Sequence, residues 1–347
     1  MSERQVAMPA LIEAARPNSL RAMQPRVYGT HFTRWFLAGG LLLFLLLLWR
    51  IGPGAIGQLV LQAGWALPFV FLPYALVIAC EALGWCFAFP SNQSPHFWAL
   101  VRLTVASKAV QFLTPSITQS AEFMKVHLLR MMGVKVDVGT ASVIVAKTTI
   151  AIAELLFIAL GLTLALASMS VDPLTMMSVA LGIVVISVGV VGVLVWQRIG
   201  LFQPLFWVSR RIRALESFVD RYKELLDSTE KNVRDHLDEG RRFGLSCFWS
   251  FLGWSAGVVE VWALLSILGV SHELSIVLLI QVWSVIVTRL TTFIPANLGT
   301  QEAGTIMVFS FVGLSPESAM AFAVLRRLRQ VGWIAGSLGI MAKMSRS

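Results

Sequence analysis

Long apolar runs separated by short polar breaks define the pattern of this 347-residue chain. Six of the runs are long enough, or nearly so, to cross a bilayer as helices. They cover residues 35–49, 65–89, 136–167, 174–196, 243–268 and 317–342. Two further apolar segments, 97–131 and 275–312, are interrupted near the middle by breaks that contain proline. The pattern predicts an all-α polytopic membrane protein with about six full transmembrane helices plus two re-entrant, broken helical hairpins.

The two interrupted segments match each other without a gap when the chain is shifted by one constant interval. The matched pairs are Pro115/Pro295, Glu122/Glu302, Gly133/Gly313, Ala141/Ala321 and Lys147/Arg327. The same order of a proline, an acid, a glycine and a base indicates an internal duplication; the alternative is a chance match in a biased composition. Counting the crossings gives the two copies opposite orientations. We therefore predict an inverted-topology internal repeat, the architecture that secondary transporters use for alternating access.

The charged residues give the expected orientation. Only 14% of the residues are charged and 56% are hydrophobic, which excludes a water-soluble domain. The net charge of +9 comes from bases near the ends of apolar runs, which is typical of positive-inside topology and not of nucleic-acid binding. We expect the N and C termini in the cytoplasm and the chain in a bacterial inner (cytoplasmic) membrane.

Four units follow from this orientation. Residues 1–34 form a cytoplasmic N-terminal arm, residues 35–170 a first membrane half with the inner re-entrant hairpin, and residues 171–342 a second half with the outer hairpin. A cytoplasmic helical loop at residues 198–242 interrupts the second half.

Motifs for cofactors, metals and hydrolysis do not account for the polar residues. The histidines have no metal-ligand spacing, the three cysteines are not paired, and neither a P-loop nor a dinucleotide fingerprint occurs, so no cofactor or metal is predicted. Gly253-Trp-Ser-Ala-Gly257 fits a serine-nucleophile pattern, but it falls within a membrane helix. We interpret Gly253 and Gly257 as a helix-packing face, as with Gly332 and Gly336. A transporter is favoured over an enzyme.

Three arginines within one apolar run are the main functional signal. A buried arginine costs about 2.5 to 3.5 kcal/mol even on the lenient insertion scale, so Arg326, Arg327 and Arg329 need anionic partners. Arg326 and Arg329 lie about 60° apart around a helix, whereas Arg327 is turned by about 100° from Arg326, so the three cannot all face one partner. Lys147 and Arg289 add positive charge within the membrane segments. The candidate counter-ions are Glu81, Glu122, Glu154 and Glu302.

Two uses of these charges stay open. Guanidinium groups suit phosphate bidentately, which favours an anionic lipid headgroup as substrate, whereas internal Arg–Glu pairs would only hold helices together. At the breaks, Asn297 and Gly299 are expected to expose backbone amides to an anion. The predicted substrate-binding residues are Pro115, Glu122, Lys147, Arg289, Pro295, Asn297, Gly299, Glu302, Arg326, Arg327 and Arg329.

Both breaks resemble the signature regions of a known family. The stretches PSITQSAEFMKVHLLRMMGV and FIPANLGTQEAG are similar to those of the lysylphosphatidylglycerol synthase/flippase transmembrane family, where the patterns read roughly P-x-x-x-G-E-x-x-R and P-x-x-x-G-x-x-E. The residues that match by position are Pro115, Glu122, Pro295, Gly299 and Glu302. Ala121 and Lys125 depart from the glycine and arginine that the first pattern commonly has.

The resemblance implies lipid translocation or handling. The soluble aminoacyl-transferase domain of the bifunctional members is not found in this sequence, so lipid aminoacylation is not expected. We expect a flippase or transporter for an anionic or polyprenyl-phosphate-linked lipid, related to phospholipids, glycolipids or hopanoids. The alternatives are an intramembrane lipid-modifying enzyme and a non-transporting membrane partner of a lipid-synthesis complex. Membrane lipids are the expected partners, nucleic acid is not, and a lipid-synthesis enzyme or a second copy of the chain stays open.

Overall fold

The architecture was analysed in a computed structural model of the chain. It describes residues 64–91, 93–113, 120–167, 173–203, 213–270, 272–292 and 294–344, together with a few isolated positions outside these ranges. The predicted arm at residues 1–34 and most of the apolar run at residues 35–49 lie outside the described residues.

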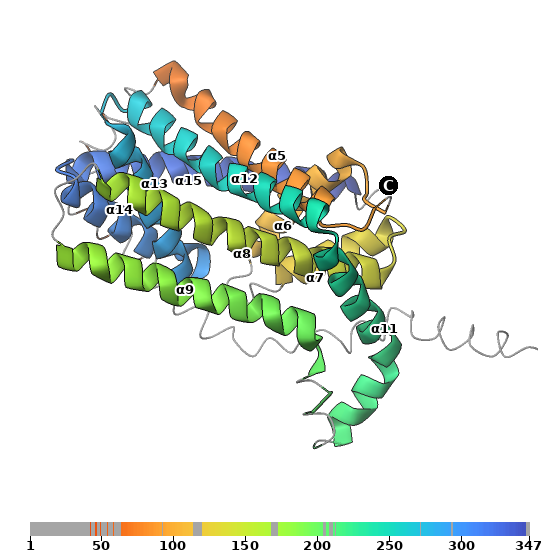
Figure 1. Ribbon diagram of the computed structural model, residues 1–347. Coiled ribbons are helices and arrows are strands. Elements are labelled where there is room, and N and C mark those ends of the chain that lie inside the picture. The colour runs from red at the N-terminus through yellow and green to blue at the C-terminus, as the bar shows by residue number, and fades with distance from the viewer. Residues whose placement is uncertain are drawn as a thin grey trace, which may run out of the picture.

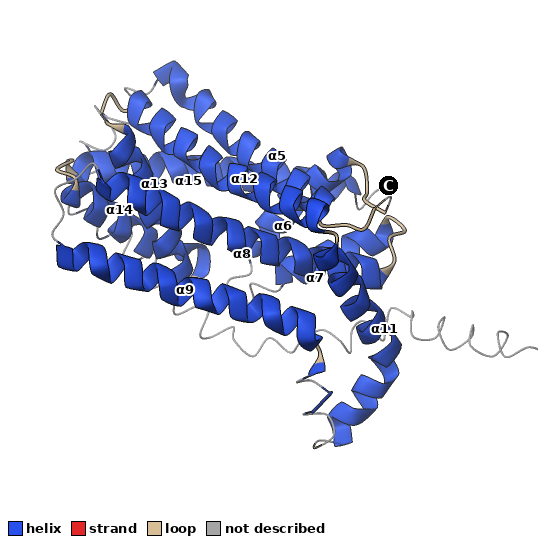
Figure 2. Cartoon of the chain, viewed as in Figure 1, coloured by secondary structure: helices blue, strands red, loops and turns tan. Residues whose placement is uncertain are grey.

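Within the described ranges every regular element is a helix (Figure 2). The first half contains η2 (Gly64–Phe71), α5 (Leu72–Phe87), α6 (Phe97–Leu113), α7 (Ser120–Met131) and α8 (Val136–Ala167). The second half contains α9 (Pro173–Gly200), α11 (Arg213–Asp238), α12 (Gly240–Ile267), α13 (Leu274–Leu290), η3 (Pro295–Asn297), α14 (Thr300–Phe311) and α15 (Pro316–Met344). The predicted all-α class is thus confirmed for this part of the chain.

Four of these helices are long and apolar enough to cross a membrane. They span Phe69–Phe87, Val136–Ala167, Met176–Gly200 and Gly240–Ile267, and α13 is a shorter apolar helix. The full arrangement of about six crossings and two re-entrant hairpins goes beyond this finding and stays a prediction.

The spacing of the sequence repeat recurs in local structure. The constant interval that takes Pro115 to Pro295 also takes the start of α7 to the start of α14, and the start of α8 to the start of α15. In each copy a glycine with positive φ, Gly133 at 84° and Gly313 at 76°, ends the preceding helix, because glycine adopts this conformation without steric cost. The turns close in the same way, since the amide after each glycine, at Val134 and Leu314, donates to a carbonyl five residues earlier, at 3.1 Å and 2.8 Å.

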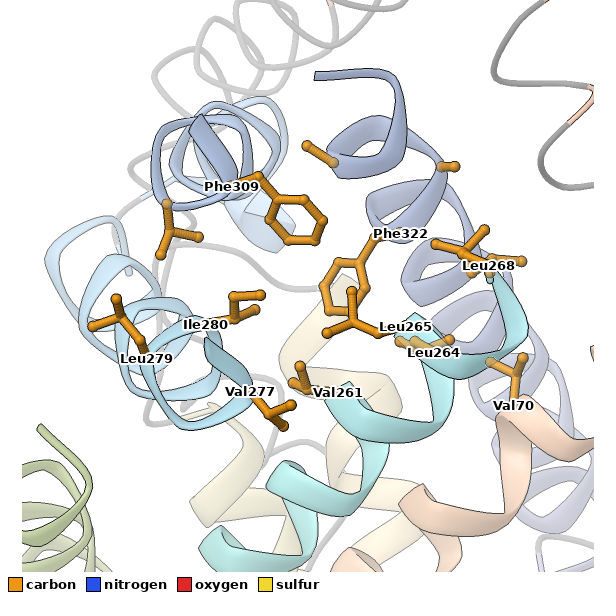
Figure 3. Close-up of a cluster of buried hydrophobic side chains, with 14 of the residues drawn as sticks. Val70, Val261, Leu264, Leu265, Leu268, Val277, Leu279, Ile280, Phe309 and Phe322 are labelled. Atoms are coloured by element: carbon orange, nitrogen blue, oxygen red, sulfur yellow. The ribbon is translucent and has the colours of Figure 1, made fainter. Parts of the chain in front are cut away.

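The two short returning helices lie at opposite ends of the long ones. In Figure 1, α7 lies near the right end of α8 and α14 near its left end, while α11 leaves the bundle at the end where α7 lies. The contacts also correspond, because α8 packs on α13 as α15 packs on α6. One cluster of buried apolar residues joins α12 to α15, with the Phe309 and Phe322 rings 5.4 Å apart (Figure 3), and a second joins α5 to α8 and α11.

Small residues bring α5 and α12 close together. A Cβ atom added at Gly84 of α5 would lie 2.9 Å from the Ser250 Oγ and 3.3 Å from the Ser246 carbonyl oxygen of α12. In the other direction Gly253 faces the Cys80 Cβ, which a Cβ on that glycine would approach to 3.4 Å. Ser246 Oγ donates to the Gly84 carbonyl at 2.8 Å. The halves therefore meet through close helix contact and a buried hydrogen bond.

The predicted packing glycines fare unequally. Gly257 lies against Gln281 and Gly332 against Phe71, as a packing face requires, whereas no atom of the described residues lies within 4 Å of a Cβ added at Gly336. Packing within the described part of the chain is thus found at three of the four positions, and for Gly336 it stays a prediction.

The amphipathic helix α11 buries a histidine. His236 is only 2% exposed, and neither ring nitrogen has a hydrogen-bond partner among the described residues. Burial lowers the pKa of His236, and Arg242 lowers it further, against the opposing influence of Glu239. Since the unfolded chain binds a proton more readily than the native one, acid destabilises the fold through this residue.

We expect the thermal unfolding midpoint to fall as the pH drops below the ordinary histidine pKa of 6.5. The loss in free energy of unfolding from this residue is at most about 1.4 kcal/mol per pH unit. His236→Gln should flatten the dependence between about pH 7 and pH 5, and the exposed His127→Gln should leave it unchanged. Tryptophan fluorescence during heating measures the midpoint. Equal slopes for His236→Gln and the unaltered protein would show that the buried imidazole does not titrate with unfolding.

Candidate functional site

The second break is a tight turn held by backbone conformations that are unusual outside glycine. Ala296 and Asn297 have φ values of 55° and 49°, and Gly299 follows at 78°. For Ala296 this left-handed conformation costs about 1–2 kcal/mol, so surrounding contacts must hold it. Thr300 Oγ1 donates to the Asn297 carbonyl at 3.2 Å, and Thr291 Oγ1 to the Asn297 Oδ1 at 3.1 Å.

Arg327 of α15 closes this turn. Its Nη1 donates to the Ala296 carbonyl at 2.9 Å and its Nη2 to the Asn297 carbonyl at 3.1 Å. Its Nε donates to the Glu302 Oε1 at 2.6 Å. The Glu302 side chain is only 1% exposed and that of Arg327 15%. The predicted partnership of these two residues is therefore present, and the pair is enclosed by protein.

The expectation that Asn297 and Gly299 expose free backbone amides is wrong for this structure. Gly299 N–H donates to the Glu302 Oε2 at 2.7 Å, and Asn297 N–H donates to the Ile294 carbonyl at 2.9 Å. Glu302 stands three residues after the N-cap Gly299, the position from which a glutamate commonly returns to satisfy the first amide of a helix. The local chain thus provides an acceptor for each of these two amides. Pro295 begins the short helix η3 at the turn.

The first break carries the corresponding pair in a more open setting. Lys147 Nζ lies 3.0 Å from the Glu122 Oε1, and Lys125 Nζ lies 3.3 Å from the Glu122 Oε2. The Lys147 side chain is 50% exposed and the Glu122 side chain 20% exposed. Lys125 also lies 5.1 Å from the Trp85 ring centre. Pro115 lies outside the described residues.

Arg289 pairs with Glu154, another predicted counter-ion. The pair joins the end of α13 to the middle of α8, and the Arg289 guanidinium lies 5.7 Å from the Trp254 ring centre. The Arg289 side chain is 53% exposed, whereas that of Glu154 is 10% exposed. Glu154 and Lys147 are seven residues apart on α8, so their side chains share one face of that helix. Lys147 and Arg289 are thus two cations near this face of α8, and about half of each side chain is exposed.

Arg326 and Arg329 turn to a partner that the sequence reasoning missed. Both pair with Glu260 of α12, with Arg326 Nε 3.3 Å from the Glu260 Oε1. Arg327 faces Glu302 instead, so the prediction that the three arginines cannot share one partner is confirmed. Arg326 also donates to the Gln281 Oε1 at 2.9 Å and to the Ser284 Oγ at 3.0 Å. Glu81, the fourth predicted counter-ion, pairs with Lys108 at 2.8 Å.

The apolar helices, with polar and charged groups enclosed between them, define an integral membrane protein. The protein-family model of the lysylphosphatidylglycerol synthase TM region matches residues 35–339 of the chain. Since the match covers most of the chain, the protein belongs to this lipid-related membrane family. Comparison with curated proteins and with solved structures found no match.

Proposed function

We propose that this protein is a lipid flippase or transporter that moves an anionic or polyprenyl-phosphate-linked lipid across a bacterial inner membrane. Both termini are in the cytoplasm, and the chain acts as a carrier and not as an enzyme. The observation that carries the proposal is the pair of repeat-related ion pairs at the two breaks, Glu122–Lys147 and Glu302–Arg327. The first pair is half exposed and the second is enclosed, and the short helices that carry the two glutamates, α7 and α14, lie at opposite ends of α8 (Figure 1).

This asymmetry suits alternating access. In an inverted repeat, the two copies adopt different conformations, and exchanging them turns a site that is open to one side into a site open to the other. In the conformation described here Lys147 is available to a headgroup, while Arg327 is committed to the turn at Ala296 and Asn297. In the opposite conformation Arg327 becomes the available cation. Arg289, half exposed beside Glu154, is the further cation offered in the present conformation.

A translocation assay tests the proposal. The full chain is reconstituted into liposomes that contain a labelled lipid, either phosphatidylglycerol or a polyprenyl phosphate, and label accessible to a membrane-impermeant quencher is followed in time. Lys147→Gln removes a charge-assisted contact and should slow translocation about tenfold or more. Lys135→Gln, at an exposed position in the turn before α8, should leave the rate within about twofold.

The outcome that contradicts the proposal is equally definite. If the unaltered protein moves none of these lipids in liposomes, or if Lys147→Gln moves them at the unaltered rate, transport through this site fails. Formation of a modified lipid by the purified chain would instead establish an enzyme. Co-purification with a lipid-synthesis enzyme, without movement, would establish a non-transporting partner.

A further inference from the structure

A second group of charged residues is separate from the two repeat-related ion pairs. We call it the central charge cluster; it consists of Tyr74 and Glu81 on α5, Lys108 on α6, Glu260 on α12, and Arg326 and Arg329 on α15. These four helices come from both halves of the chain, and the packing of α5 on α12 and of α6 on α15 brings them together.

The members of the cluster form a continuous series. Lys108 Nζ lies 2.8 Å from the Glu81 Oε2 and 5.6 Å from the Tyr74 ring centre. The guanidinium carbon of Arg329 lies 4.1 Å from the centre of the same ring. Arg329 in turn pairs with Glu260, which also holds Arg326. Tyr74 therefore has a cation near it from α6 and another from α15, an arrangement that the electron-rich face of an aromatic ring favours.

The cluster carries more positive than negative charge. Lys108, Arg326 and Arg329 are cations, and the carboxylates that pair with them are Glu81 and Glu260, so one positive charge is left without a partner among the described residues. The Arg329 side chain is only 12% exposed, and its buried Nε has no hydrogen-bond partner in the described part of the chain. A surplus charge and an unused donor in a membrane interior are costly unless an anion accompanies them.

At the second break the charges balance, since Glu302 pairs with one base, Arg327, whereas Glu122 at the first break has both Lys147 and Lys125 beside it. The repeat interval relates each charged member of the cluster to an uncharged residue. Glu81, Lys108, Glu260, Arg326 and Arg329 correspond, in that order, to Val261, Thr288, Cys80, Ala146 and Thr149. The charged members of the cluster thus have no charged counterparts at the equivalent positions of the repeat. Exposure falls from 27% at Lys108 to 5% at Glu260, so the Glu81–Lys108 end is the more accessible one.

We propose that the central charge cluster binds one phosphoryl group, with Arg329 and Lys108 as the cations that meet its oxygens and Tyr74 between them. A guanidinium offers two parallel donors to phosphate, and an ammonium adds a point charge, so the surplus charge and the unused Nε donor are both satisfied. This deepens the proposed function, on which the lipid origin of the phosphoryl group rests. Binding itself requires no movement across the membrane.

Binding is tested on the purified full chain in uncharged detergent. Phosphatidylglycerol, inorganic phosphate and, as a phosphate-free reference, a diacylglycerol are titrated separately, and the thermal unfolding midpoint is read from tryptophan fluorescence, since a ligand of the folded state raises it. We expect a saturable rise with a phosphoryl compound and none with diacylglycerol. Arg329→Gln should weaken the apparent affinity about tenfold or more. Arg234→Gln, at an exposed ion pair on α11, should leave it unchanged.

Glu260→Gln provides a test of opposite sign. It raises the surplus charge, so the rise caused by the phosphoryl compound should be larger and occur at lower concentration. In a purely structural cluster the variant would lower the unfolding midpoint, and no ligand would raise it in either protein. Saturation by phosphatidylglycerol alone identifies a lipid headgroup, and saturation by inorganic phosphate as well identifies the bare anion as sufficient.

The proposal is overturned if the protein shows no phosphoryl-dependent rise, or if the rise is the same in Glu260→Gln, in Arg329→Gln and in the unaltered protein. Should Arg329→Gln not fold, Lys108→Gln takes its place with the same expected loss. Binding that persists in a protein unable to move lipid in liposomes would contradict the proposed function while leaving this site intact. If the protein moves lipid and these variants change neither binding nor transport, the central charge cluster is not the site, while the proposed function stands.

Discussion

Replacing Arg327 with alanine is expected to cost the fold about 3–5 kcal/mol, the loss typical when one partner of a buried ion pair is removed. The substitution leaves Glu302, which is 1% exposed, without its cation. It also leaves the carbonyl groups of Ala296 and Asn297 without the donors that hold the turn. The chain should give little folded protein after extraction into detergent, and a lower unfolding midpoint for what remains.

The repeat supplies the matched control. Lys147 occupies the equivalent position in the first half, but half of its side chain is uncovered by protein, so Lys147→Ala should cost only about 0–1 kcal/mol. Removing both charges, in Glu302→Gln/Arg327→Met, should recover part of the stability because no buried charge is left alone. Comparable losses for Arg327→Ala and Lys147→Ala would contradict the view that the second pair is sealed and the first is open.

Replacing Gly84 with valine is expected to separate α5 from α12. Even a Cβ atom at this position would lie 3.3 Å from the backbone oxygen of Ser246 and 2.9 Å from the Ser250 Oγ, and valine adds two methyl groups beyond it. A backbone oxygen cannot rotate away, so we expect a loss of at least about 1–3 kcal/mol, the usual range for overpacking. The hydrogen bond from Ser246 to the Gly84 carbonyl would be lost as well.

Gly244→Val on α12 is the control for this prediction. No atom of the described residues lies within 4 Å of its added Cβ, so the same change of residue type should lower the unfolding midpoint little. The midpoint and the fraction of protein that elutes as a single species in detergent give the comparison. If Gly84→Val were as stable as Gly244→Val, close approach at this crossing would not be holding the two halves together.

Much of the helical framework could be predicted from the sequence, because bilayer-length apolar runs and glycine turns are local signals. The run predicted at residues 136–167 coincides with α8, and the two short helices after the breaks, α7 and α14, begin at equivalent positions of the repeat. The pairing of Glu122 with Lys147 and of Glu302 with Arg327 could be predicted for the same reason, since each half repeats one local arrangement.

What could not be predicted depends on which helices face each other. Glu260 lies 66 residues from Arg326, and no spacing along the chain shows that α12 and α15 bring the two together. The amides at Asn297 and Gly299 are a different case, since the spacing from Gly299 to Glu302 is a known helix-start pattern and could have indicated that Glu302 satisfies the Gly299 amide. The roles of the predicted site residues in lipid binding remain predictions.

The contact between α5 and α12 can form only late in the synthesis of this protein. Gly84 and Ser246, which meet there, are separated by 162 residues of chain. At a synthesis rate of about 5–20 residues per second, roughly 8 to 30 seconds pass between the appearance of the two residues. During that interval the glycine face of α5 lacks its partner helix, whereas Glu81 can already pair with Lys108, which follows 27 residues later. Co-translational chaperones and neighbouring membrane proteins therefore encounter the first half of the chain before the second half has been synthesised.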